Sequence, residues 1–166
     1  MNSSVTDQIL NVCKTLNKNA VQYLIVGGTA VAFHGYFRWS QNHSGEPTDK
    51  FDLDIWYNPT YANYFNLLNA IEELGQDVIK FREEQSPDPT KSYFRLDLEK
   101  ITLDFLPKLK SLSKFRDSFD KKDTVKINEV DILFINFDDL IEDKSANARP
   151  KDLLDIQQLK AKKKEK

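Results

Sequence analysis

Apolar residues in the first part of the chain switch between helical and strand spacing. Those between Val5 and Leu16 are separated by four, three and four residues, which predicts an amphipathic helix. The apolar run 23–26 ends at two glycines and predicts a buried strand that enters a tight turn. A second helix is expected from Thr29 to a stop at Gly35, followed by a polar loop over 38–50.

The segment 51–57 alternates apolar and polar residues, which is the pattern of a strand with one face in the core. Thr60 is a suitable N-cap for a helix that ends near Gly75, and 86–90 is expected to be a loop. The aromatic and apolar stripe of this helix is interpreted as core; it consists of Tyr61, Tyr64, Phe65 and Leu68.

The second half of the chain predicts further strands followed by helices. Two strands end at Leu106 and turn near 99–100, a short helix covers 109–119, and 124–127 pairs with 130–135 in a hairpin. Asp138 or Asp139 caps a helix, and Pro150 suits the first turn of the last one. Its apolar stripe is Leu153, Leu154, Ile156 and Leu159. The tail 161–166 is expected to fray.

Length and order of elements together predict the fold class. At 166 residues, with neither an internal repeat nor a linker, the chain is expected to form a single domain over 1–166. Helices interspersed with short strands indicate an α+β fold, in which a mixed β-sheet is flanked by helices.

The charge and the cysteine content limit which binding partners and which cellular compartment the sequence predicts. Lys and Arg number 24 against 26 Asp and Glu, so no global basic field holds nucleic acid, and any such contact must be local. No apolar run approaches the ~18 residues of a membrane span, and the first residues lack the layout of a signal peptide. Cys13 is the single cysteine and cannot form an internal disulfide. We therefore expect a cytoplasmic protein without membrane contact.

Three aspartates form the constellation that indicates chemistry. Asp52 and Asp54 lie two apart on one strand face, where Cα atoms are about 6.6 Å apart, and Asp104 lies on the matching face of a later strand. Converging carboxylates select Mg²⁺ or Mn²⁺, and two such ions stabilise the attacking and leaving oxygens of a phosphoryl displacement. The other interpretation of Asp-x-Asp is the solvent face of a half-buried sheet.

The glycine pair upstream fits the same chemistry. The turn formed by Gly27, Gly28 and Thr29 can bring backbone N–H groups, a helix N-terminus and a hydroxyl against a triphosphate. His34, one of two histidines, is interpreted as a packing or capping residue rather than a ligand.

The sequence also resembles a known family. The run YLIVGGTAVAFHGY at 23–36, followed by Arg38 and by DLDIW at 52–56, resembles the signature of the DNA polymerase β-like nucleotidyltransferase superfamily. More narrowly, it is similar to small bacterial nucleotidyltransferases related to AbiE-type toxins. The stretch DLI at 139–141, Lys144 and ARPKDLLDI at 148–156 resembles the closing motif of that group. This resemblance implies the polymerase β-like nucleotidyltransferase fold.

The resemblance also implies roles for individual residues. It implies that Gly27, Gly28 and Thr29 bind the nucleotide phosphates and that Asp52 and Asp54 bind the metal ions. Asp104 would be the third carboxylate, acting as bridge or base. Further nucleotide-binding positions are Arg38, Ser40, Lys144, Arg149, Lys151 and Asp152; Arg149 and Asp152 could instead pair with each other. Lys151 and Asp152 also suit a solvated first helical turn. The loop 41–50 is longer than the usual spacing, which suggests a lid or an acceptor-specific insertion.

These features predict a Mg²⁺-dependent nucleotidyltransferase that moves a nucleoside monophosphate from a nucleoside triphosphate to an acceptor hydroxyl. The acceptor stays open: the toxin-like resemblance suggests RNA, while a protein side chain or a small molecule such as an antibiotic is an alternative. A chain of 166 residues leaves little room for an acceptor-binding domain, so we expect a homodimer or a partner protein to complete the acceptor groove. The competing hypothesis is a catalytically silent, antitoxin-like module that binds a nucleotide or a protein.

Overall fold

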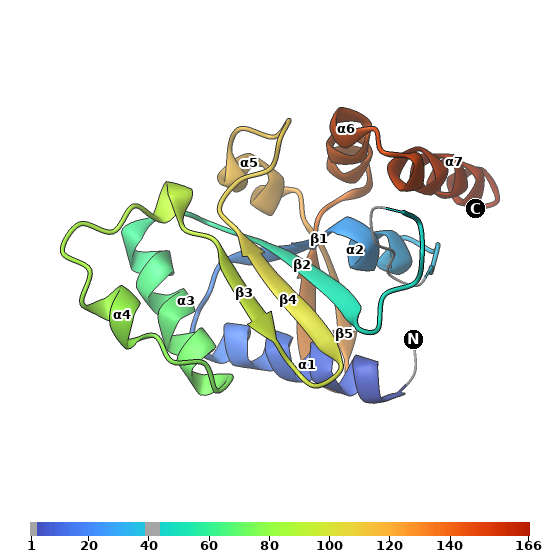
Figure 1. The fold of residues 1–166 in the computed structure, drawn as a ribbon. Coiled ribbons are helices and arrows are strands. Elements are labelled where there is room, and N and C mark those ends of the chain that lie inside the picture. Colours follow the sequence, from blue (N-terminus) through green and yellow to red (C-terminus); the bar gives the residue numbers. More distant parts are fainter. Residues whose placement is uncertain (1–2, 39–43) are drawn as a thin grey trace.

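A six-stranded mixed sheet forms the centre of the molecule in the computed structural model, which describes residues 3–38 and 44–166 (Figure 1). The strand order is β3-β4-β2-β1-β6-β5. The strands are β1 (Tyr23–Val26), β2 (Phe51–Tyr57), β3 (Phe94–Asp97), β4 (Ile101–Leu106), β5 (Asp123–Ile127) and β6 (Val130–Phe134). The prediction of a mixed β-sheet flanked by helices is confirmed.

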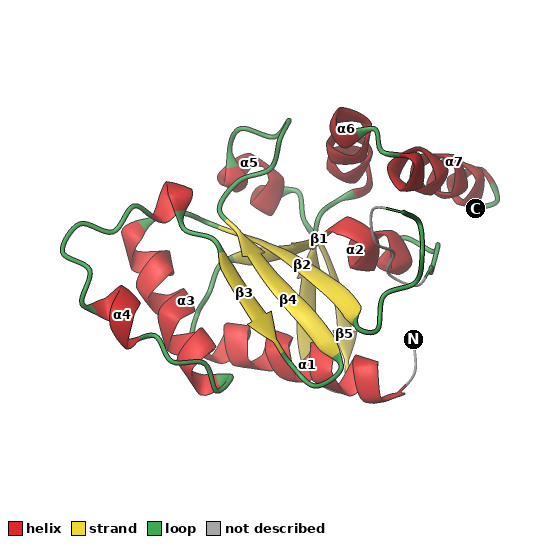
Figure 2. Ribbon diagram, in the orientation of Figure 1, coloured by secondary structure: helices red, strands yellow, loops and turns green. Residues whose placement is uncertain are grey.

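Helices flank this sheet (Figure 2). They are α1 (Ser3–Lys18), α2 (Gly27–Phe33), α3 (Tyr61–Glu73), α4 (Ile79–Arg82), the 3₁₀ turn η1 (Pro89–Lys91), α5 (Phe115–Asp120), α6 (Phe137–Asn147) and α7 (Pro150–Lys164). Helix α1 packs against α3, β4 and β6, whereas α2 packs against β1, β2 and α6, which in turn contacts α7. No helix in the described part of the chain is long and apolar enough to cross a membrane.

The register of the central strands determines which residues can share a site. Strand β2 is antiparallel to β1 and parallel to β4. Asp54 is paired with Val26 on one side and with Asp104 on the other. The glycine pair that follows β1 therefore lies beside Asp54, and the third aspartate lies on the opposite side of the same residue.

Burial follows the predicted alternation in the two strands that carry the aspartates. Phe51, Leu53 and Ile55 are 2% exposed or less, while Asp52 and Asp54 between them are partly exposed. Strand β4 repeats the pattern, with every second residue buried. Because strand side chains alternate between faces, burying the apolar face presents the carboxylates on the other face.

The predicted hairpin is present, and its turn has a defined geometry. Asn128 and Glu129 connect β5 to β6 with φ angles of 49° and 63°. Positive φ at both central residues is the requirement of a type I′ turn, which matches the twist of the flanking strands. The sequence signal is weak because Glu, unlike Gly, rarely adopts this conformation.

Several predicted boundaries are wrong. Helix α2 begins at Gly27 rather than at Thr29, so it follows β1 without an intervening turn. The helix expected over 109–119 is confined to α5, and α4 is not predicted at all. The cap of α6 is Asn136, whose side chain accepts a hydrogen bond from the backbone N–H of Asp139; the predicted caps, Asp138 and Asp139, lie two and three residues too late.

Two predicted apolar stripes are also corrected. In α3, Tyr64 and Leu68 are fully buried, but Tyr61 and Phe65 lie on the exposed side of the helix. In α7, Leu159 is buried while the other leucines of the stripe, Leu153 and Leu154, are exposed. The buried face of α7 instead carries Asp152 and Asp155, because these carboxylates pair with cations from elsewhere in the chain.

The C-terminal segment is helical for longer than predicted. The tail from residue 161 was expected to fray, but α7 continues to Lys164. Its last turn carries three lysines, Lys162, Lys163 and Lys164. Cations at this end interact favourably with the helix dipole and with the last carbonyls.

Candidate functional site

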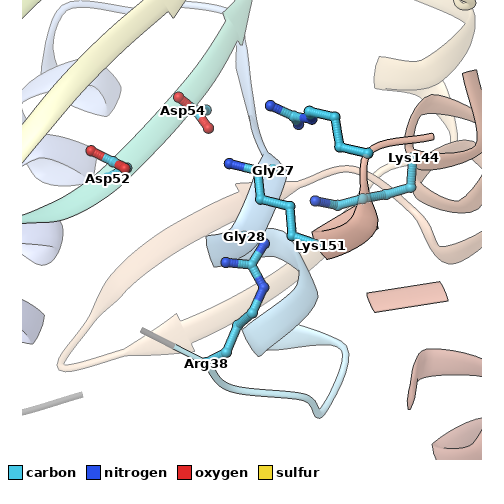
Figure 3. Close-up of a pocket in the computed structure, with 8 residues that line it drawn as sticks. Gly27, Gly28, Arg38, Asp52, Asp54, Lys144 and Lys151 are labelled. Atoms are coloured by element: carbon cyan, nitrogen blue, oxygen red, sulfur yellow. The ribbon is translucent and has the colours of Figure 1, made fainter. Parts of the chain in front are cut away.

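A polar pocket lies where β1, β2, α2, α6 and the start of α7 meet. One side carries Asp52 and Asp54, and the other carries cations (Figure 3). Its lining consists of Gly27, Gly28, Arg38, Asp52, Asp54, Lys144, Arg149 and Lys151. Eight of the twelve predicted site residues therefore surround one cavity, although they come from segments more than one hundred positions apart.

Gly27 is required at its position by two independent features. Its φ is +64°, a left-handed value that residues with a Cβ rarely adopt. A Cβ there would also lie 2.6 Å from Oδ2 of Asp54, closer than van der Waals contact permits. Glycine therefore leaves the space beside the Asp54 carboxylate that a Cβ would occupy.

Crowding of negative charge changes the acidity of the pocket aspartates. Burial raises the pKa of Asp54 to about 6, with further contributions from the carboxylates of Asp104 and Asp52. Burial and Asp104 also raise the pKa of Asp52, although cations including Arg95 and Lys151 oppose the shift. A divalent cation or an additional positive charge in the pocket would relieve this repulsion.

Two buried aspartates of α7 hold the cationic wall in place. Asp155 accepts two hydrogen bonds from the guanidinium of Arg38, at 2.7 and 2.8 Å, and its Oδ2 lies 2.9 Å from Nζ of Lys144. Asp152 accepts from Lys144 at 3.1 Å and from Nε of Arg149 at 2.6 Å. Of the two alternatives for Arg149 and Asp152, the structure shows the one in which they pair with each other.

The acidity of these two aspartates reflects that network. Burial alone would raise the pKa of Asp155, but hydrogen bonds and charge from Arg38 and Lys144 outweigh it and hold the pKa below the ordinary value. The same balance, with Arg149 and Lys144 as partners, lowers the pKa of Asp152. Both carboxylates are fully buried, so they stay ionised only because they are paired.

Lys151 is the cation of the pocket that the network does not neutralise. It forms no ion pair or side-chain hydrogen bond with any residue that the structure describes, and its side chain extends toward the two aspartates (Figure 3). Burial, followed by the charges of Arg149 and Arg38, lowers the pKa of this amine. A partly buried, unpaired ammonium next to other cations is the electrostatic environment of an anion site.

Asp104 lies next to Asp54 but does not line the pocket. Its Oδ1 accepts a hydrogen bond from the hydroxyl of Tyr93 at 2.5 Å and is 3.7 Å from Nε of Arg95. Tyr93 is half exposed, at 48%, and precedes β3. The third carboxylate is thus held on the β3 side of the sheet, away from the cationic wall.

One further predicted residue, Thr29, is placed differently. Thr29 is fully buried, and its hydroxyl donates to the backbone carbonyl of Asp52 at 3.3 Å, so it braces α2 against β2 rather than lining the pocket. Ser40 lies outside the described residues. His34 packs as predicted: its Nε2 is 2.8 Å from the carbonyl oxygen of Ile135, and its ring meets Phe134 and Phe137 edge-on.

Sequence reasoning assigned no role to Asp155 or Tyr93. The signal for Asp155 was available, because Asp152 and Asp155 are one helical turn apart, at the spacing that places two side chains on one face. For Tyr93 no such signal exists, since its contact with Asp104 depends on the pairing of β3 with β4.

Asp52 and Asp54 are the carboxylates of the pocket that could hold a metal ion. Within residues 3–38 and 44–166, no group of three His, Cys, Asp or Glu side chains is arranged to hold a metal ion. Mg²⁺ is commonly held by one or two carboxylates, with phosphate oxygens and water completing the octahedron. Asp52 and Asp54 face the pocket as such a pair.

A comparison of the chain with models of known protein families finds no match, and a comparison with curated protein sequences finds none either.

Proposed function

We propose that this chain is a Mg²⁺-dependent nucleotidyltransferase with a polymerase β-like fold. The observation that carries the proposal is the pocket in which two carboxylates face a wall of cations with one unpaired amine, Lys151. The carboxylates suit a divalent ion, and the cations suit the phosphates that the ion accompanies. A simple metal site would not need the cations, and a simple anion site would not place two aspartates against them.

In this proposal, each side of the pocket has a distinct task. The backbone of Gly27 and Gly28, together with Lys151, binds the triphosphate, while Arg38 and Lys144 are held rigidly by Asp155 so that their charge needs no reorganisation during the reaction. Asp52 and Asp54 would hold Mg²⁺, which neutralises charge that develops on the phosphate oxygens.

The reaction is an in-line displacement at the α-phosphorus. An acceptor hydroxyl oxygen forms a bond to phosphorus, the bond to the bridging oxygen breaks, and pyrophosphate leaves with the electron pair. The hydroxyl proton passes to a carboxylate, a role for which we propose Asp104. The hydrogen bond from Tyr93 fixes the orientation of that carboxylate.

Label transfer tests the proposal directly. Wild-type protein and the Asp54→Asn variant are incubated with Mg²⁺, each α-labelled nucleoside triphosphate in turn, and total RNA together with cell lysate. Transfer by the wild type that is lost in Asp54→Asn supports the proposal. The matched control is Asp97→Asn, which neutralises an exposed aspartate of β3 that pairs with Lys50 and should transfer like the wild type.

Nucleotide binding provides a second readout that does not depend on the acceptor. Mg²⁺ with a nucleoside triphosphate should raise the melting temperature of the wild type, because a ligand of the folded state stabilises it by mass action. Lys151→Gln should reduce this shift. If no nucleotide shifts the melting temperature and no label is transferred, the proposed function is wrong.

A further inference from the structure

A second hollow adjoins the pocket on the other side of Asp54. It lies between the end of β4, the segment that follows it, and α6. Gly27, Asp54, Lys144 and Arg149 line both cavities. The second hollow adds Val26, Leu106, Lys108, Leu109, Lys110, Asp143 and Asn147 to this shared wall. A ligand in either cavity therefore reaches the same carboxylate.

The charges around the second hollow favour an anion. Lys108 and Lys110 are exposed at its edge, and neither makes an ion pair or a side-chain hydrogen bond within the described ranges. The acidic residue that the hollow adds is Asp143, which is 7% exposed, and burial raises its pKa although Lys144 opposes the shift. Two unpaired ammonium groups thus lie at the edge of a hollow that Lys144 and Arg149 also line, against the two carboxylates of Asp54 and Asp143.

The two cavities also differ in volume, and each volume suits a ligand group of a different size. The pocket between the aspartates and the cations has a volume of about 70 Å³, whereas the second hollow has about 300 Å³. Binding sites for small molecules start at roughly 300 Å³. The first cavity has room for a phosphate group with its ion, and the second has room for a group of mononucleotide size.

The geometry of phosphoryl transfer relates the cavities to each other. Attacking and leaving oxygens lie roughly in line on opposite sides of the reacting phosphorus, so an acceptor must approach from the side away from the departing pyrophosphate. Arg38 and Lys151 lie only on the first side of Asp54, and Lys108 and Lys110 lie only on the second.

We propose that the second hollow is the acceptor site, and that Lys108 and Lys110 recognise a phosphate ester on the acceptor, either a mononucleotide or the end of a nucleic acid. This inference rests on the proposed function. The apolar parts of Leu106 and Leu109 would contact the uncharged portion of the acceptor, and its hydroxyl would lie near Asp54, whose neighbour on β4 is Asp104, the proposed proton acceptor. Two lysines at a phosphate ester give charge recognition with little dependence on base sequence.

Equilibrium binding tests this site separately from catalysis. The variant Lys108→Gln/Lys110→Gln is compared with the wild type and with Lys14→Gln/Lys80→Gln. The control removes two exposed lysines of α1 and α4 that likewise form no ion pair within the described ranges. Helix α4 lies at the end of the molecule opposite α6 and α7 (Figure 1). The probes are a nucleoside 5′-monophosphate, by calorimetry, and a short fluorescent oligoribonucleotide with a free 3′-hydroxyl, by anisotropy.

We expect the Lys108/Lys110 variant to bind at least one probe about tenfold or more weakly than the control does. For the oligoribonucleotide, the slope of log K against log salt should fall by about 2, because each lysine–phosphate contact contributes roughly 1. Weakening of the oligoribonucleotide alone identifies a nucleic-acid end, and weakening of both probes identifies a mononucleotide-sized site.

Three results would overturn the proposal. The first is equal binding of both probes by the Lys108/Lys110 variant and the control. The second is weaker binding of Mg²⁺–nucleoside triphosphate by the Lys108/Lys110 variant, because the hollow would then belong to the nucleotide. The third is probe binding through these lysines in a wild-type protein that neither binds nor transfers any nucleotide. In that case the anion site exists but serves no acceptor, and the proposed function is what has failed.

Discussion

Replacing Gly27 with alanine should affect the stability of the fold and the activity of the site to different extents. The added methyl group has two consequences. A left-handed backbone costs a residue with a Cβ about 1–2 kcal/mol. The Cβ would also lie 2.6 Å from Oδ2 of Asp54, so the carboxylate must retreat by about 0.8 Å to reach the 3.4 Å of ordinary contact.

These two consequences have different magnitudes in different assays. For a domain of this size, 1–2 kcal/mol corresponds to a fall of about 2–8 °C in melting temperature. A displacement of about 1 Å at reacting groups costs roughly 100-fold in rate. We therefore expect a Gly27→Ala protein that folds, melts a few degrees lower, and transfers nucleotide about 100-fold more slowly.

Gly75→Ala is the matched control for this experiment. Gly75 has a φ of +97°, and a Cβ there would meet nothing within 4 Å. The control therefore carries backbone strain without disturbing Asp54. Unfolding in urea and the thermal shift with Mg²⁺–nucleoside triphosphate are measured on both variants. If Gly27→Ala loses no more nucleotide response than Gly75→Ala, the close approach to Asp54 has no functional meaning and the reasoning is refuted.

Three further predictions concern charge and backbone. Asp54→Asn should stabilise the protein relative to the wild type, and more at pH 7 than at pH 4.5. The pKa of Asp54 is raised to about 6, so the wild type loses folding free energy as the pH rises from the ordinary pKa of an aspartate through 6 and the buried carboxylate ionises. The urea midpoints of variant and wild type should therefore differ more at pH 7 than at pH 4.5, and an equal difference at both pH values would contradict this. Asp155→Ala should lower the free energy of unfolding by about 3–5 kcal/mol, since it leaves Arg38 without its carboxylate and Lys144 with Asp152 alone; a loss under about 1 kcal/mol would show that the network is not structural. Glu129→Gly should stabilise the hairpin turn by up to about 1 kcal/mol in the same assay, because glycine adopts positive φ without strain, and a destabilised variant would argue against the turn geometry.

Elements whose information is local were predictable from the sequence. The strand Phe51–Tyr57 was recognised from alternation alone, because burying one face of a strand imposes a period of two on its residues. The α3 cap at Thr60 was found for a similar reason, since its side chain accepts a hydrogen bond from a backbone N–H three residues later.

The buried face of α7 could not be predicted in this way. Hydrophobic periodicity assigned Leu153 and Leu154 to the core, whereas the structure buries Asp152 and Asp155. A carboxylate is buried only where a partner neutralises it, and the partner of Asp155 is Arg38, 117 positions away. Local patterns contain no information about a pair at that separation.

In the candidate site, too, local features were predictable from the sequence and long-range contacts were not. Asp52 and Asp54 could be assigned to one strand face from their spacing, and the structure brings both into the pocket. The expectation that Asp104 converges with them depends on the order of strands: the sheet pairs Asp54 with Asp104, but Asp104 does not line the pocket, and the described residues contain no group of three carboxylates arranged to hold a metal ion. The hydrogen bond that turns Asp104 toward Tyr93 comes from β3, whose position in the sheet the sequence did not reveal.

The ion pair between Arg38 and Asp155 has a consequence for the order in which the molecule matures during synthesis. Translation delivers Gly27, Asp52 and Asp54 early, but the carboxylate that fixes Arg38 and Lys144 is added more than one hundred residues after Arg38. Because a domain generally folds as a unit, the cationic wall cannot form until α7 has left the ribosome. The pocket that the aspartates share with these cations is therefore completed only when the last helix is added.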